Sequence, residues 1–102
     1  MNLFDISQSS QEELFDTLTQ TPNTRIERIV SYGQSSPDGF WYDQDEDEWV
    51  AVIEGGAEIL FEREQAPVAL GKGGTLFIPA HTKHRVTKTA NPTIWLAVFM
   101  RS

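Results

Sequence analysis

The chain has 102 residues, the length of one domain with a single modest hydrophobic core. Its net charge is -7, from fifteen acidic and eight basic residues, which argues against nucleic acid or an anionic membrane as partner because both select clustered Lys and Arg. The sequence has no cysteine, so disulfides, thiolate metal ligands and thiol nucleophiles are excluded.

The N-terminal segment gives two predictions. It lacks the basic stretch and apolar run of a secretion signal, and no part of the chain has the apolar length of a membrane span, so we expect a cytoplasmic protein. Residues 9–13 then place early acidic residues before a short apolar stripe that starts at Leu14, which is typical of a helix N-terminus. We expect residues 1–24 to form an N-terminal arm with a short helix that ends near Pro22.

The remainder, residues 25–102, has the pattern of short strands separated by turns. Stretches rich in β-branched and aromatic residues recur at roughly even spacing, and Gly, Pro, Asn or Asp bounds most of them. This pattern is typical of an all-β sandwich or barrel, whose closure protects the strand edges and whose interior can hold a ligand. The predicted strands are 25–32, 40–42, 49–53, 57–62, 67–70, 75–78, 84–89 and 93–100.

The strongest local pattern is the stretch 40–55, FWYDQDEDEWVAVIEG. It predicts two apolar strands that are joined by an acidic tip and closed by a glycine turn. If Glu48 opens the second strand, its carboxylate is expected close to the side chains of Tyr42 and Gln44 on the first strand. These three residues form the first candidate site.

The sequence resembles the cupin family in two motifs. The first cupin motif is glycine, five residues, His-x-His, three or four residues, Glu, six residues and glycine. Glu48 and Gly55 match it with the correct gap. Tyr42 and Gln44 occupy the two histidine positions, and Ser36 occupies the position of the leading glycine.

The second cupin motif is glycine, five residues, proline, any residue, glycine, two residues and histidine. It matches at Gly73, Pro79 and His84, with His81 in place of the second glycine. The resemblance implies a cupin double-stranded β-helix, a jelly-roll barrel over residues 25–102, behind the short N-terminal helix. The chain is similar to small single-domain bacterial cupins, but with a degenerate first motif.

The resemblance also implies a set of ligands. In metal-binding cupins the two histidines, the glutamate and the later histidine bind one divalent ion. Here Glu48 and His84 would be the typical ligands, and Gln44 through its amide oxygen or Tyr42 through its phenol would have to supplement them. Because metal sites usually need three or four good protein donors, tight zinc binding is not expected, and a weakly held Mn, Fe, Ni or Zn ion is the candidate cofactor.

Three functions are open at this point. The first is a metal-dependent dioxygenase, isomerase or lyase, with Tyr42 as catalytic proton donor or substrate-orienting hydroxyl. The second is a binding or sensing module in which Tyr42, Gln44, Glu48 and His84 bind a small molecule directly in an apolar cavity. The third is a structural homodimer that forms through an aromatic face, and a homodimer is expected in any case. Arg28 either reaches inward, to pair with Glu48 or a bound carboxylate, or lies outward in solvent.

Overall fold

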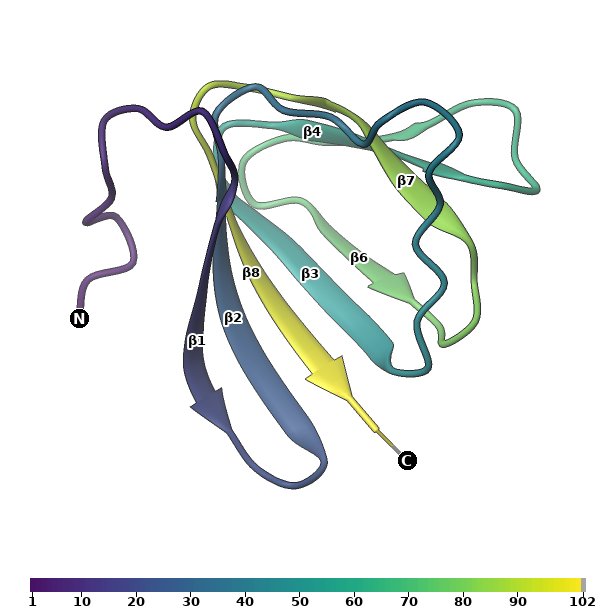
Figure 1. The fold of residues 1–102 in the computed structure, drawn as a ribbon, viewed down its shortest axis with the longest axis horizontal. Helices are drawn as coiled ribbons and strands as arrows, with labels where there is room; N and C mark the ends of the chain where they lie inside the picture. The colour runs from purple at the N-terminus through teal and green to yellow at the C-terminus, as the bar shows by residue number, and fades with distance from the viewer. Residues whose placement is uncertain (102) are drawn as a thin grey trace.

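The computed structural model describes residues 1–101 and consists of eight strands in two facing sheets (Figure 1). The larger sheet has the order β1-β2-β8-β3-β6, the smaller has the order β5-β4-β7, and every pairing is antiparallel. The strands are β1 (Leu14–Gln20), β2 (Thr24–Ser31), β3 (Asp47–Glu54), β4 (Ala57–Phe61), β5 (Val68–Leu70), β6 (Thr75–Ile78), β7 (His84–Thr89) and β8 (Thr93–Met100). Within residues 1–101 there is no helix long and apolar enough to cross a membrane.

The hydrophobic core lies between the two sheets. Successive side chains of a strand point to opposite faces, so alternate residues of each strand are directed inward. Val50 and Val52 of β3 and Trp95 of β8 therefore meet Ile59 of β4 from the facing sheet. This arrangement confirms the predicted all-β, double-sheet architecture. Ser102, the last residue of the predicted barrel range, lies outside the described residues.

The predicted N-terminal helix is wrong, because residues 14–20 form β1 and pair with β2. The apparent helix start is a local turn instead: the Ser10 hydroxyl donates to the Glu12 carbonyl (2.7 Å) and accepts from the Glu12 amide (3.1 Å). Serine side chains compete with helix formation in this way. The predicted boundary between residues 24 and 25 falls inside β2, which begins at Thr24 and pairs with β1 in the same sheet.

The predicted strand at residues 40–42 does not form beside β3. β8 occupies one edge of β3 and β6 occupies the other, so neither edge is available. The chain between β2 and β3, residues 32–46, which we call the strap, instead passes beside β7 (Figure 1). Tyr42 makes an isolated bridge to His84, in which each amide donates to the other residue's carbonyl at 2.7 and 3.1 Å.

The β3–β4 turn gives a prediction about stability. Gly55 has a φ of +83°, and a Cβ added there would lie 2.7 Å from Thr93 Oγ1 and 2.8 Å from Thr93 Cα. Gly39 in the strap has a similar φ of +79° but nothing within 4 Å of an added Cβ. We expect Gly39→Ala to lower the free energy of unfolding by about 1 kcal/mol, and Gly55→Ala by about 3 kcal/mol or more, because only the second adds a steric clash. Urea denaturation of both variants measures the difference, and equal losses would contradict it.

Candidate functional site

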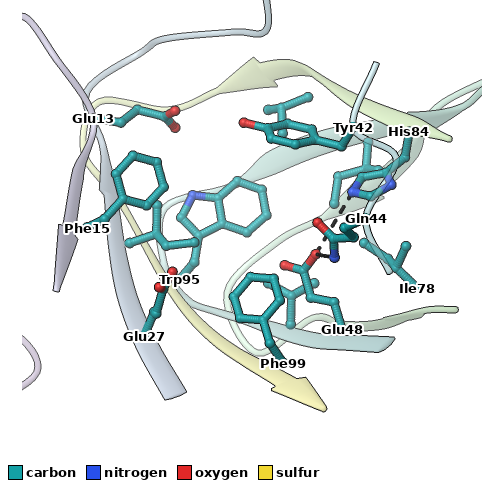
Figure 2. Close-up of a pocket in the computed structure, with 14 residues that line it drawn as sticks. Glu13, Phe15, Glu27, Tyr42, Gln44, Glu48, Ile78, His84, Trp95 and Phe99 are labelled. Carbon is teal, nitrogen blue, oxygen red and sulfur yellow. Dashed lines mark hydrogen bonds and ion pairs between the residues drawn. The ribbon is translucent and has the colours of Figure 1, made fainter. Parts of the chain in front are cut away.

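A cavity of about 100 Å³ lies between the two sheets and is partly open to solvent (Figure 2). Its wall is mainly apolar and aromatic, with a few polar side chains that point inward, which is the usual composition of a small-molecule site. Both sheets and the strap contribute to it. The fourteen lining residues are Glu13, Phe15, Glu27, Ile29, Tyr42, Gln44, Glu48, Val50, Ile59, Ile78, His84, Val86, Trp95 and Phe99.

Three of the predicted site residues form a polar group on one side of the cavity. Gln44 Nε2 donates a hydrogen bond to Glu48 Oε1 at 2.9 Å, and Glu48 Oε1 lies 3.9 Å from His84 Nε2 (Figure 2). Glu48 and His84 are only 8% and 4% exposed. A separation of 3.9 Å is too long for a direct hydrogen bond, so the carboxylate and the imidazole face each other without being joined.

The protonation of this pair follows from its surroundings. His84 Nδ1 lies 2.7 Å from the Thr82 carbonyl, which can only accept, so Nδ1 carries the proton and Nε2 of the neutral ring is an acceptor. Burial lowers the pKa of His84, against the opposing effect of this hydrogen bond. Burial also raises the pKa of Glu48, and the hydrogen bond from Gln44 offsets this only in part. Both pKa shifts favour the uncharged forms, because a charge loses hydration inside the barrel.

Tyr42 lies next to this group and presents a hydroxyl to the cavity. Its ring stacks on His84, with centroids 5.4 Å apart, and meets the Phe40 ring edge-on at 4.8 Å. The hydroxyl points across the cavity toward Glu13 (Figure 2). Burial, followed by the charges of Glu13 and Glu48, raises the pKa of Tyr42. The phenol therefore keeps its proton at neutral pH and can donate a hydrogen bond.

The opposite side of the cavity carries a carboxylate that was not predicted. Trp95 Nε1 donates to Ser31 Oγ at 3.0 Å, and the Ser31 hydroxyl donates to Glu13 Oε2 at 2.5 Å. This chain of hydrogen bonds fixes the Glu13 side chain in place. Glu13 was missed because it was assigned to the start of a helix. Reading residues 14–20 as a strand would have found it, since alternation back from the inward Phe15 directs Glu13 inward.

Glu27 is a second unpredicted carboxylate, and it forms an ion pair with a basic side chain. Arg25 Nε lies 2.8 Å from Glu27 Oε2, and the Arg25 guanidinium also pairs with Glu46 at 3.2 Å. The same guanidinium lies over the Phe99 ring, 4.4 Å from its centroid. Strand alternation in RIERIV directs Arg25, Glu27 and Ile29 to one face, so this signal was present in the sequence.

Arg28 lies away from the cavity, on the outer face of the larger sheet. Because its neighbours Glu27 and Ile29 point inward, alternation directs Arg28 outward. It is buried there rather than solvated, pairing with Asp16 at 2.7 Å and donating to the carbonyls of three N-terminal residues. The structure therefore brings together Tyr42, Gln44, Glu48 and His84 around one cavity, and it does not bring Arg28 to them.

The polar group of Gln44, Glu48 and His84 contains two typical ligands for a divalent ion, Glu48 and His84. Glu48 Oε1 and His84 Nε2 face each other as two ligands of one ion would, but Gln44 directs its amide nitrogen toward Glu48. Among residues 1–101, no three His, Cys, Asp or Glu side chains are grouped so as to hold a metal. Since metal sites take three or four protein ligands, these residues do not fit a tightly held ion.

Comparison with solved structures identifies the family. A protein from Ralstonia eutropha JMP134, described as a "putative mannose-6-phosphate isomerase", is 45% identical, with a TM-score of 0.96 over 100% of this chain and 97% of that chain. A cupin superfamily protein from Desulfitobacterium hafniense DCB-2 is 19% identical, with a TM-score of 0.80 over 95% and 84% of the two chains. An RmlC-like cupin with a double-stranded β-helix fold from Methanocaldococcus jannaschii is 16% identical, with a TM-score of 0.74 over 95% and 87%.

The Desulfitobacterium and Methanocaldococcus likenesses show the fold alone. No protein-family model matches the chain, and no curated protein matches it in sequence. The full-length likeness to the Ralstonia protein, together with the named cupin structures, agrees with the two motifs read from the sequence. The chain belongs to the cupin superfamily.

Proposed function

We propose that this protein binds a small organic molecule in the cavity between its sheets, through direct contacts with Tyr42, Gln44, Glu48 and His84. The observation that carries the proposal is the convergence of these four polar side chains, from the strap, β3 and β7, on one largely apolar cavity. A few polar groups within an apolar wall orient a small ligand. A cavity of roughly 150 Å³ holds benzene, so the enclosed volume here suits a ligand, or part of one, of about four non-hydrogen atoms.

The burial of Glu48 supports a binding role. A carboxylate inside a two-sheet core loses hydration, and its raised pKa means that its ionised form destabilises the fold at neutral pH. An apolar residue at this position would pack without that cost. Groups that weaken stability in this way are concentrated at binding and catalytic sites, where the function depends on them.

The description of the Ralstonia protein suggests a phosphorylated sugar as ligand, and the charges of this cavity argue against one. Phosphate sites in proteins are built from Arg or Lys side chains or from helix N-termini. Of the fourteen lining residues described above, three are glutamates and none is Lys or Arg. We therefore infer an unphosphorylated ligand. A metal-dependent dioxygenase, isomerase or lyase has less support, because the donor set supplies only two typical ligands.

A screen by nuclear magnetic resonance tests the proposed function. Small cationic, neutral and anionic compounds are added in turn to ¹⁵N-labelled protein, and the indole N–H signal of Trp95, at the back of the cavity, reports binding. We expect saturable shifts for at least one class of compound. Shifts that persist unchanged in Glu48→Gln, or a complete lack of shifts across the library, would contradict binding at this site.

Metal content gives the second prediction. We expect the purified protein, after growth in medium supplemented with Mn, Fe, Ni and Zn, to hold far less than one ion per chain. The matched variant is the double substitution Tyr42→His with Gln44→His, which restores the histidines of the cupin motif and so provides four donors with Glu48 and His84. That variant should bind about one ion per chain. Elemental analysis measures both, and stoichiometric metal in the unmodified protein would refute the direct-contact proposal.

The pH dependence of stability gives the third prediction. Because the folded state raises the pKa of Glu48, the stabilising effect of its proton is present at low pH and is lost as the pH rises through the folded-state pKa. Glu48→Gln cannot ionise, so it should be more stable than the unmodified protein at pH 8, and this advantage should shrink as the pH falls toward 4.5.

Glu58→Gln is the control for this experiment, since Glu58 lies on β4 outside the cavity lining and the charge change is the same. Urea denaturation at several pH values measures the difference between the two variants. A Glu48→Gln variant that is less stable than the unmodified protein at pH 8 would contradict the prediction, because it would show that the fold stabilises the ionised carboxylate.

We also propose that two copies of the chain pair through the outer face of the larger sheet. Four apolar side chains lie in register across this face: Ile26 is opposite Val98, Val98 is opposite Trp49, and Trp49 is opposite Phe77. Trp49 is 36% and Phe77 is 50% exposed. A continuous apolar row with aromatic side chains is typical of an interface between subunits.

Lysine substitutions test this pairing. Trp49→Lys should weaken the dimer by at least about 30-fold, the effect of losing an aromatic residue at the centre of an interface. Ala69→Lys, at an exposed position of β5 on the other sheet, adds the same charge and should leave association unchanged. Sedimentation velocity at micromolar concentration measures both. A monomeric unmodified protein would rule the dimer out.

A further inference from the structure

We propose that the ligand of this cavity is a small organic cation that carries a primary ammonium group. This inference rests on the proposed function and adds the chemical class of the ligand to it. It follows from three properties of the cavity: which groups can donate and accept hydrogen bonds, which charges lack a partner, and how the aromatic rings are placed.

The space between the Glu48 carboxylate and the His84 imidazole suits a hydrogen-bond donor. Glu48 Oε1 accepts, and His84 Nε2 accepts because the proton of this ring is held on Nδ1 by Thr82. One of the two N–H donors of the Gln44 amide is already used by Glu48 Oε1. His84 is more than nine-tenths buried, and its Nε2 has no hydrogen-bond partner within the part of the chain that the structure describes.

An ammonium nitrogen satisfies both acceptors at once. Charge-assisted N–H···O and N–H···N bonds are roughly 2.8 Å long, and two acceptors 3.9 Å apart fit around one nitrogen at that distance. A carboxylate or phosphate placed at the same point would face two acceptors and gain no hydrogen bond from either. The polar side of the cavity therefore discriminates by donor chemistry and not only by size.

The charges of the cavity favour the same class of ligand. Three carboxylates line it, and only Glu27 has a basic partner, Arg25 at 2.8 Å. Among residues 1–101, no Lys or Arg pairs with the carboxylate of Glu13 or Glu48, whose contacts are with the neutral Ser31, Gln44 and His84. A cation in the cavity would lie between the carboxylates of Glu13 and Glu48, which approach it from opposite sides (Figure 2).

The aromatic walls supply the third argument. The rings of Phe15, Tyr42, Trp95 and Phe99 surround the space between the acids (Figure 2). Aromatic faces attract cations within about 6 Å, more strongly when both are shielded from water. The Phe99 ring already has the Arg25 guanidinium 4.4 Å from its centroid. The apolar part of an alkylammonium ion would pack against the same rings.

Three probes of matched size separate the ligand classes: n-propylammonium, propan-1-ol and propionate. Each is titrated into ¹⁵N-labelled protein at constant ionic strength, with the Trp95 indole and Gln44 side-chain signals as readouts. We expect n-propylammonium to bind at least about ten-fold more tightly than propan-1-ol, since charge-assisted hydrogen bonds are roughly twice as strong as neutral ones, and propionate not to bind.

Matched variants test whether the cavity carboxylates cause the preference for n-propylammonium. Glu48→Gln and, independently, Glu13→Gln should each weaken n-propylammonium binding by about ten-fold, since each removes one charge from the cavity. Glu58→Gln removes the same charge outside the cavity and should leave the affinity unchanged. Equal loss in all three variants would mean that the ion responds only to the overall charge of the protein, which overturns the inference.

The remaining outcomes separate this inference from the proposed function. Equal binding of propan-1-ol and n-propylammonium, or preferred binding of propionate, would overturn the cationic class and leave cavity binding in place. The same holds if all three probes fail but other compounds of the screen shift the Trp95 signal. If no compound of any class shifts that signal, both the ligand class and the proposed function are refuted.

Discussion

The pairing of β3 on both of its edges determines the geometry of the site. With β8 on one side and β6 on the other, β3 is an interior strand, and alternation directs Glu48 inward together with Val50 and Val52. The strap finds no free edge there and crosses to β7, where Tyr42 bridges His84. The same constraint thus buries a carboxylate in the core and brings the strap's polar side chains to it.

Local sequence signals were enough to predict the fold and part of the site. Seven of the strands are bounded by Gly, Pro, Asn or Asp turns and have β-branched or aromatic interiors, so their positions follow from short-range chemistry. The fixed spacing of the two cupin motifs then related Glu48 to His84, which are far apart in sequence. Tyr42 and Gln44 were first predicted from a hairpin with β3 that does not form, and their positions in the first motif indicated them independently.

The features that were missed depend on long-range pairing. β1 has little apolar character of its own, and it is a strand because β2 supplies an edge for it to pair with; its Phe15 lines the cavity. Only this pairing places Glu13 in the cavity. Arg28 could be assigned to a face only once the register of β2 was known, since a shift of one residue would reverse every side chain. The sequence alone shows that successive residues alternate between two faces, but not which of the two faces is directed inward.

The chemistry of this site depends on the identity of side chains at fixed backbone positions, and a shared fold does not determine it. Histidines at positions 42 and 44 would present lone pairs toward Glu48 and His84, and four such donors suit a metal ion. Tyr42 and Gln44 instead present a hydroxyl and an amide N–H, and the amide is bound to Glu48. This leaves Glu48 and His84 as acceptors that face each other, with the carboxylate of Glu13 on the opposite side of the cavity. Burial favours the protonated form of Glu48, and a positively charged ligand would compensate the ionised form within so small a cavity.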